Sequence, residues 1–552
     1  MIPDPVPASI FRRPPEQVMR LARMGSAHPT RLSFLRVMLR RMQTEGWRFD
    51  RPVWEMDAKG VGRAVYRAIG PERSYSLVAF AHDLPDHLRS DRVIATAWDA
   101  TFALFDGTPT TADLDRLHAN VPLQEAGRIS PSELSLSRAN RSVRLFSHVV
   151  DRLAAGQQPD RAEIDAVGYL MRTTAVYGSG KFGAADRATI AGRSELRGPF
   201  QVEMLSVWLT RTFTVDLVEH LAAAKGGATA VRLDRDLRRS LGVGNSTGLG
   251  LAPFLIRHPT LLNNWMMARE EALARVRAQP LASARTRSGF RTALDAARLN
   301  AENWQSEHPV QRTKLADLRA DLDRIAEHGV PDDAYPWNGL WVWAETSLSL
   351  EGQEALVALL LEPHGDLVDG LSACMDADEA AAFAVDGAVT IGALRKMLDQ
   401  RYAWALAQDH STPENIARFW YVSAEKLEPR LGNRFTEDGA ALELPIGTSR
   451  MAAELSAALA GWPEDQPLAG FLLAHPEHRF MVRRVQQSAS HPYGEIQDNL
   501  LAAGMLPIDI LRCKLAFFGA SHFDPRSDRW VRIALFQDLP YPDEVTKEPQ
   551  DA

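Results

Sequence analysis

Residues 177–183, Tyr-Gly-Ser-Gly-Lys-Phe-Gly, combine three glycines with side chains that can bind an anion. Ser179 and Lys181 lie within this segment, and Arg187 and Arg193 follow it. Glycine lets the backbone approach a ligand closely, and lysine and arginine are natural partners of carboxylate and phosphate groups. The segment therefore predicts a loop that binds a small anion. The alternative is a helix end followed by a loop whose cations face water.

Gly178, Gly180 and Gly183 match the glycine spacing of the dinucleotide-binding fingerprint. That fingerprint requires a strand before the glycines and a helix after them. The preceding residues 160–176 instead place apolar side chains at helical spacing, which predicts a helix. The segment also differs from the phosphate-binding P-loop, which has a longer spacer before its Gly-Lys pair. Neither nucleotide-binding motif is therefore expected here.

A second glycine-rich segment spans residues 242–253, Gly-Val-Gly-Asn-Ser-Thr-Gly-Leu-Gly-Leu-Ala-Pro. Asn245, Ser246 and Thr247 are residue types that commonly begin helices. A polar turn at a helix start presents backbone N–H groups to an anion, with the helix dipole behind them. We expect this segment and the first one to share one site for a small anionic substrate. The alternative is that these side chains only cap the next helix.

The residues 199–225 between the two loops predict a buried helix, because apolar side chains occur on most of its sides. Glu203, Arg211 and Asp216 are charged residues within it. Buried charges need partners or shift their pKa, and Glu203 lies near the helix start, where the dipole favours the ionised carboxylate. We predict that Glu203 is a catalytic carboxylate. The alternative is one half of a structural ion pair.

Cys513 and His522 form a third candidate, because cysteine–histidine catalysis needs a thiolate within reach of an imidazole. Both are included as catalytic candidates, although a lone cysteine is more often a small buried hydrophobe. Histidine pairs such as His475 and His478 lack the spacing of a zinc site, and we predict no metal. The sequence leaves any cofactor unknown.

The elements that must position these residues are mainly helical. Helical spacing covers most of residues 140–410, whereas short β-like runs occur at 61–80 and 515–536. An isolated hairpin is only marginally stable in water, so we expect these two to share one sheet or adjoining sheets. The sequence thus predicts a helix-dominated α+β fold. It would have a large helical core and a small antiparallel β element built from the N- and C-terminal hairpins.

Changes in composition and pattern predict four segments along the chain. They are basic N-terminal helices at 1–50, a small antiparallel β region at 51–140, a helical core domain at 141–410, and a C-terminal helical region ending in a β-hairpin at 411–552. Nine arginines stand against four acidic residues in the first segment. We expect these arginines to pair with acidic helices elsewhere or to solvate the surface, and the alternative is a basic patch that binds phosphates.

The composition excludes several classes of protein. The chain has 552 residues and a net charge of −7, which is too mild to indicate nucleic acid or a membrane surface as a partner. No apolar run is long enough to span a bilayer, and no secretion signal opens the chain. Two cysteines cannot form a disulfide framework, which fits a reducing compartment. We therefore expect a soluble cytoplasmic protein, and a homo-oligomer is compatible with its length.

Two functions remain on these grounds. The first is a metabolic enzyme that acts on a small carboxylate- or phosphate-bearing substrate, with its reaction class open. The second is a non-catalytic helical scaffold or partner-binding protein. We favour the enzyme, because glycine-rich loops cost order on folding and loops that contact ligands gain from them.

Overall fold

The computed structural model describes residues 7–85, 87, 97–122, 130–174, 190, 192–196, 198, 200–245, 258–304, 309–375, 383–411, 418–422, 429–433, 448–498, 507–519, 522–525 and 531–546. The chain divides into two compact units that interleave along the sequence. Unit 1 contains residues 1–32, 249–517 and 525–530. Unit 2 contains residues 33–248, 518–524 and 531–552. The prediction of four consecutive segments stays a prediction.

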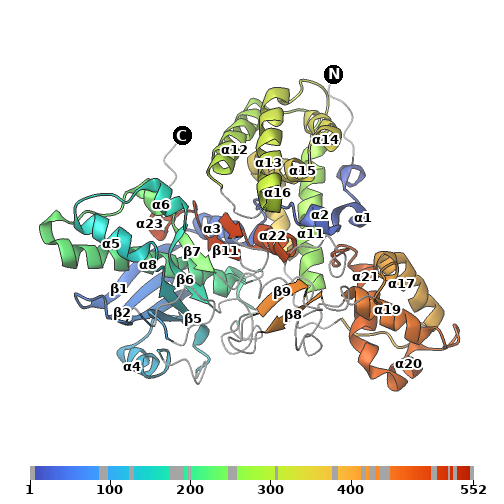
Figure 1. The fold of residues 1–552 in the computed structure, drawn as a ribbon, viewed down its shortest axis with the longest axis horizontal. Coiled ribbons are helices and arrows are strands. Elements are labelled where there is room, and N and C mark those ends of the chain that lie inside the picture. Colours follow the sequence, from blue (N-terminus) through green and yellow to red (C-terminus); the bar gives the residue numbers. More distant parts are fainter. Residues whose placement is uncertain are drawn as a thin grey trace. The chain divides into compact units, whose positions relative to one another are not determined.

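Unit 2 is built on a sheet whose nine strands have the order β1-β2-β3-β4-β5-β6-β7-β11-β10 (Figure 1). Each strand from β1 to β5 pairs antiparallel with the next, β6 and β7 are parallel, and β11 pairs antiparallel with β7. The strands are β1 (Arg48–Met56), β2 (Gly62–Ile69), β3 (Ser74–Ala81), β4 (Ala100–Asp106), β5 (Glu133–Arg141), β6 (Tyr169–Thr174), β7 (Gly242–Asn245), β10 (His522–Pro525) and β11 (Val531–Leu535).

The predicted fold is wrong in its β part. The sheet is large and mixed, and most of its strands come from the first half of the chain rather than from two terminal hairpins. Residues 61–80 contain β2 and β3, and residues 522–525 and 531–535 form β10 and β11 of the same sheet, but β4 to β7 lie between the two pairs. The prediction of a strand from residue 515 is wrong, because residues 515–518 end helix α22 (Pro507–Phe518). The two pairs therefore do not stabilise each other directly. Strands β4 and β5 lie in or overlap the β region expected at 51–140, whereas β6 and β7 lie in the segment that was expected to be helical.

Two helices cover opposite faces of this sheet. Helix α8 (Gln201–Gly226) contacts strands β3 to β7, and its Phe213 ring lies 5.4 Å from the ring of Phe102 on β4. Helix α4 (Thr111–Asn120) packs Leu114 and Leu117 onto the other face, in a buried cluster with side chains of β2 to β5. Because successive strand residues point to opposite faces, both faces of the central strands are apolar and buried.

Helix α8 confirms the buried helix predicted at 199–225, within two residues at each end. Its Arg211 is fully buried, and four backbone carbonyls accept hydrogen bonds from the guanidinium: those of Leu241 at 2.6 Å, Leu539 at 2.7 Å, Arg239 at 3.0 Å and Pro540 at 3.5 Å. The guanidinium also lies 3.8 Å from the ring centre of Tyr541. A buried cation thus holds the C-terminal segment of unit 2 against α8, because its donors have no water to bond.

The predicted helix at 160–176 is wrong. Only α6 (Arg161–Asp165) is helical there, and Tyr169–Thr174 form β6 in the middle of the sheet. A short run buried on both faces shows no alternation, so its apolar residues also fit helical spacing. The other helices of unit 2 are α3 (Phe34–Thr44), α5 (Phe146–Ala154), α9 (Arg235–Arg239) and α23 (Pro542–Val545).

Unit 1 is helical in the part of it that the structure describes, apart from the hairpin β8 (Arg418–Val422) and β9 (Pro429–Asn433). Its central helices are α11 (Pro259–Arg277), α12 (Ala284–Asn303), α13 (Pro309–His328), α14 (Pro336–Ser347), α15 (Leu350–Leu361), α16 (Gly365–Val368) and α22 (Pro507–Phe518), together with α1 (Pro15–Val18) and α2 (Leu21–Met24). Helices α17 (Ile391–Leu406), α19 (Thr448–Leu459), α20 (Leu468–Ala474) and α21 (Arg479–Ser490) enclose a separate apolar cluster. Among the described helices, none combines the length and apolar character that crossing a bilayer requires.

A buried ionic cluster joins the N-terminal segment to the core of unit 1. Glu270 accepts two hydrogen bonds from Arg13, at 2.7 and 2.8 Å. Glu354 accepts from Arg13 and Arg23, at 2.8 Å each, and also from Arg269. All five residues are buried. Two of the N-terminal arginines therefore pair with acidic helices, which is one of the two alternatives expected from the sequence.

Candidate functional site

The parallel strands β6 and β7 end side by side, and the glycine-rich residues 177–183 and 246–253 that come after these ends lie outside the described residues. Thr173 on β6 pairs with Asn245 on β7, and the strands end at Thr174 and Asn245. Helix α8 lies between them in sequence and packs on the same sheet, as in a β-α-β crossover. In sheets of this kind, ligands bind beyond the carboxyl ends of parallel strands. The segments that follow both strands therefore start from the position where a ligand is expected.

Packing within the sheet explains why two positions of the second segment are glycine. A Cβ atom on Gly242 would lie 2.3 Å from the carbonyl oxygen of Leu535 on β11. A Cβ atom on Gly244 would lie 2.5 Å from the ring of Tyr169 on β6. Close backbone approach in the sheet thus requires both glycines, so they are not evidence for a flexible loop.

Several predicted site residues cannot be placed. Ser179, Lys181, Arg187, Ser246 and Thr247 lie outside the described residues. Asn245 ends β7 and His522 begins β10, and for these two only the backbone is described.

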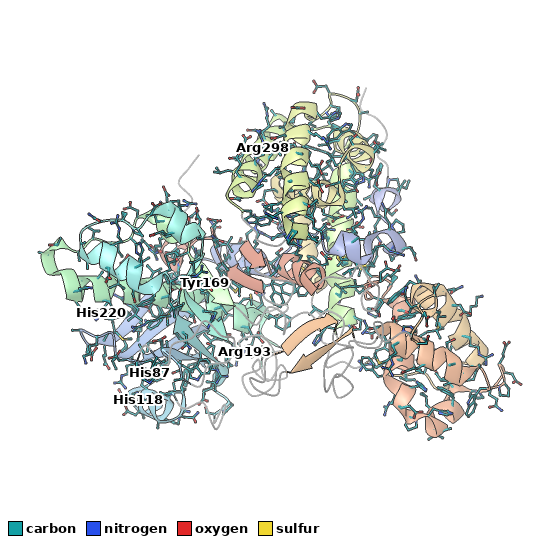
Figure 2. All side chains as sticks on the ribbon, in the orientation of Figure 1. His87, His118, Tyr169, Arg193, His220 and Arg298 are labelled. Carbon is teal, nitrogen blue, oxygen red and sulfur yellow. The ribbon has the colours of Figure 1, made fainter. Side chains whose placement is uncertain are left out.

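Arg193, which is labelled in Figure 2, forms an ion pair with Asp106 within unit 2. Its two Nη atoms donate to the carboxylate of Asp106 at 2.9 and 2.6 Å, and Nη1 also lies 3.4 Å from the hydroxyl of Tyr75. That hydroxyl donates to Glu195 at 2.5 Å. The role of Arg193 as an anchor for an anion stays a prediction, and an anion bound there would share the guanidinium with Asp106.

Glu203 occupies the first turn of α8 and is 2% exposed. In a β-α-β crossover the helix begins near the carboxyl end of the strand that precedes it. The first turn of α8 is therefore expected on the same side of the sheet as the ends of β6 and β7. Its position suits a carboxylate that acts beside a ligand, because the positive end of the helix dipole favours the ionised form.

Cys513 lies on α22 with no exposed surface, and burial raises the pKa of its thiol well above the ordinary value of 9.0. A thiol with a raised pKa is a poor nucleophile, because only the thiolate attacks. Cys513 belongs to unit 1, whereas His522 belongs to unit 2. The chemistry of Cys513 is thus that of a small buried hydrophobe.

Two arginines near the strand ends were not among the site residues predicted from the sequence. Arg172 on β6 is 4% exposed, and Arg138 on β5 pairs in register with Thr174, the last residue of β6. Since Asn140 pairs with Arg172, the register places both arginines on one face of the sheet. Burial lowers the pKa of Arg138 to about 10. The sequence offered little signal for them, because the residues around Arg138 are mostly polar and those around Arg172 had been expected to be helical.

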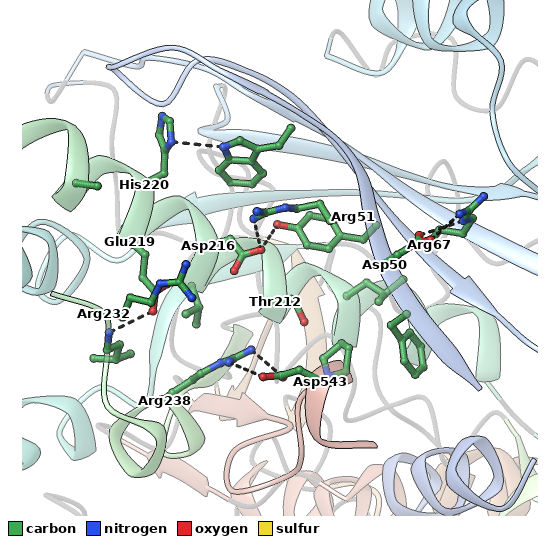
Figure 3. Close-up of a pocket in the computed structure, with 18 of the residues that line it drawn as sticks. Asp50, Arg51, Arg67, Thr212, Asp216, Glu219, His220, Arg232, Arg238 and Asp543 are labelled. Atoms are coloured by element: carbon green, nitrogen blue, oxygen red, sulfur yellow. Dashed lines mark hydrogen bonds and ion pairs between the residues drawn. The ribbon is translucent and has the colours of Figure 1, made fainter. Parts of the chain in front are cut away.

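A cavity of about 690 Å³ opens elsewhere in unit 2, between β1, β2 and the second half of α8 (Figure 3). Segment 230–233, Arg238 on α9 and Asp543 on α23 close its other sides. Three arginine–aspartate pairs line it within hydrogen-bond distance, and we call them the closed pairs: Arg51–Asp216 at 2.7 Å, Arg67–Asp50 at 2.5 Å and Arg238–Asp543 at 3.1 Å.

The cavity also holds two carboxylates on one helix whose surroundings differ. Asp216 accepts hydrogen bonds from Arg51 and from the hydroxyl of Tyr66, each at 2.7 Å. Glu219 accepts a hydrogen bond from the backbone N–H of Leu233 at 3.1 Å, yet burial raises the pKa of its carboxyl above the ordinary 4.5. Carboxylates with raised pKa values in cavities are typical of binding and catalytic sites.

His220 is fixed at the mouth of the same cavity. Its Nδ1 accepts a hydrogen bond from the indole N–H of Trp54 at 3.4 Å, and its Nε2 lies 2.7 Å from the carbonyl oxygen of Asp57. Because a carbonyl only accepts, Nε2 donates this hydrogen bond. The two contacts fix the orientation of the His220 ring beside the cavity.

Comparison with known proteins finds no protein-family model, no curated protein and no solved structure that matches this chain.

Proposed function

We propose that this protein is an enzyme that binds a small carboxylate- or phosphate-bearing substrate at the carboxyl ends of strands β6 and β7. The observation that carries the proposal is the register of the parallel pair, in which Thr173 faces Asn245. It sets the carboxyl ends of β6 and β7 side by side, and residues of a glycine-rich segment follow each end in the sequence. A shared site for one small ligand needs that adjacency.

The charge near these strand ends supports an anionic substrate. Arg138 and Arg172 share a face of the sheet close to the end of β6, and both are withdrawn from bulk water. Arginine in a partly dehydrated site binds carboxylate or phosphate more strongly than it does at an open surface. Lys181 would add a further cation from the segment that follows β6.

Glu203 is the group that we assign to proton transfer. It is the acidic residue of the first turn of α8, the helix that connects the two strands. A carboxylate held beside a bound anion can take a proton from the substrate and later return it. The chemistry of the described residues leaves the reaction class and any cofactor open.

Anion binding by the full-length chain tests the proposal. Isothermal calorimetry with inorganic phosphate, pyrophosphate and succinate should detect binding of at least one of them to the wild type. Lys181→Ala should weaken that binding about tenfold or more, because a charge-assisted hydrogen bond contributes roughly 1.5–3 kcal/mol. Lys396→Ala, which removes an exposed lysine from α17, is the matched control. Equal affinities of the wild type and Lys181→Ala would contradict the shared site.

A further inference from the structure

The cavity on the second half of α8 is a separate place from the ends of β6 and β7. Glu219 lines the cavity, whereas Glu203 lies in the first turn of the same helix. At a rise of 1.5 Å per residue, the two glutamates are about 24 Å apart along the helix axis. The cavity therefore needs an explanation of its own, one that does not rest on the proposed function.

One arginine–carboxylate pair in this cavity is longer than hydrogen-bond distance, whereas the three closed pairs are within it. The Nε atom of Arg232 lies 3.9 Å from Oε2 of Glu219, which is beyond hydrogen-bond distance. The Arg232 side chain is 91% exposed, and the Glu219 side chain is 21% exposed. Among the described residues, the N–H of Leu233 is the hydrogen-bond donor to Glu219, through Oε1. Oε2 of Glu219 and the guanidinium of Arg232 thus lie close to each other without a hydrogen bond between them.

The cavity is lined by equal numbers of arginines and carboxylates. Four arginines, namely the three of the closed pairs and Arg232, face four carboxylates, namely their three partners and Glu219. A ligand with a single net charge would disturb this balance, whereas a ligand that carries one charge of each sign preserves it. The remaining wall includes the aromatic side chains of Phe49, Trp54 and Tyr66. Such a wall suits an apolar side chain.

We propose that this cavity binds an α-amino acid, with its ammonium group at Glu219 and its carboxylate at Arg232. The ammonium would insert at Oε2 of Glu219, and the exposed guanidinium of Arg232 would turn to meet the carboxylate. The side chain would lie against Trp54 and its aromatic neighbours. The free energy that burial of the Glu219 carboxylate costs would be partly recovered, because the ligand's ammonium would donate a hydrogen bond that Arg232 at 3.9 Å does not.

Binding of the twenty common amino acids to the full-length chain, one at a time, tests this site. Thermal shift should single out at least one amino acid, and calorimetry should then compare it with its deaminated acid and its decarboxylated amine. We expect the amino acid to bind at least tenfold more tightly than either analogue, since each analogue leaves one charge unpaired. The site is refuted if none of the twenty binds, or if one analogue binds as tightly as the amino acid.

Two variants assign the two charges. Glu219→Gln should weaken binding of the amino acid about tenfold and leave binding of the deaminated acid unchanged. Arg232→Gln should weaken both the amino acid and the deaminated acid, and spare the amine. Glu327→Gln on α13 and Arg285→Gln on α12 remove exposed charges elsewhere and serve as matched controls. Unchanged binding in Glu219→Gln or Arg232→Gln would overturn the assignment.

The two proposals fail separately. Lys181→Ala should leave binding of the amino acid unchanged, because the ends of β6 and β7 are a different place on unit 2. Glu219→Gln should likewise leave phosphate or succinate binding unchanged. Loss of both ligands in either variant would mean that one site, not two, explains the data.

Discussion

At the scale of single residues, two neighbouring arginine–glutamate pairs show how burial changes the contribution of an ion pair to stability. Arg12 and Arg13 are neighbours in sequence, and each pairs with a glutamate of α11. The Arg12–Glu271 pair keeps 34% and 21% of its side chains exposed, whereas Arg13 and Glu270 keep 2% and 0%. An exposed pair contributes little because water and salt screen it. Removing one partner of a buried pair leaves a charge without compensation.

Replacing Arg13 should therefore destabilise unit 1 strongly. Arg13→Met removes three hydrogen bonds, two to Glu270 and one to Glu354, and keeps a side chain of similar length. We expect a loss of about 3–5 kcal/mol in the free energy of unfolding, measured by urea denaturation. Arg12→Met is the adjacent control and should cost under about 1 kcal/mol. If Arg13→Met lost as little stability as Arg12→Met, the buried cluster would not stabilise the fold.

At the scale of elements, β7 depends on having no side chains at two positions. Gly242→Ala should push the strand against the Leu535 carbonyl of β11 and lower the free energy of unfolding by about 1–3 kcal/mol, as overpacking does. Gly192→Ala is the control, because a Cβ atom there would meet nothing within 4 Å. Thermal unfolding of the two variants checks this. A melting temperature of Gly242→Ala equal to that of the wild type would contradict the close approach.

The elements also show what the sequence could predict. Helix α8 was predicted because its apolar residues continue over seven turns, far longer than a strand could. Strand β6 was missed because six residues buried on both faces carry no period. Strand β7 was missed because glycine disfavours strands unless a neighbour approaches closely. Pairing of 169–174 with 242–245 depends on contacts between distant segments, which no local pattern reveals.

Candidate site residues could likewise be predicted only where the residue types alone suggest chemistry. This was so for both glycine-rich segments and for Glu203. The cavity of Asp216 and Glu219 was not identified as a site, although Asp216 was noted as a buried charge. Its other sides come from β1, the segment 230–233 and α23, and only the fold assembles them.

At the scale of the whole molecule, Glu351 and Glu354 of unit 1 and Glu219 of unit 2 respond to acid in opposite ways. Burial alone would raise the pKa values of Glu351 and Glu354 in unit 1, but the arginines around them outweigh it and hold both values well below the ordinary 4.5. A depressed pKa contributes stability that is present above the ordinary value and lost as the pH falls towards the folded-state value. In unit 2, the raised pKa of Glu219 acts in the other direction: its contribution is present below 4.5 and lost as the pH rises through the raised value.

Unit 1 should therefore open before unit 2 on acidification below about pH 4.5, the ordinary glutamate pKa. Hydrogen exchange read by mass spectrometry, corrected for intrinsic rates, measures this for each unit. Amides of α15 in unit 1 should lose protection at a higher pH than amides of α8 in unit 2. Loss of protection in α8 first would contradict the assignment of the acid-sensitive charges.

The order of strands in the sheet has a consequence for biosynthesis. Strand β7 lies between β6, which the ribosome makes shortly before it, and β11, which is made near the end of the chain. Until β11 emerges, β7 presents an unpaired edge of N–H and C=O groups, the kind of edge that recruits other strands. Unit 1 is translated almost entirely during that interval. A nascent chain that stalls within unit 1 would thus carry an incomplete sheet with this edge exposed.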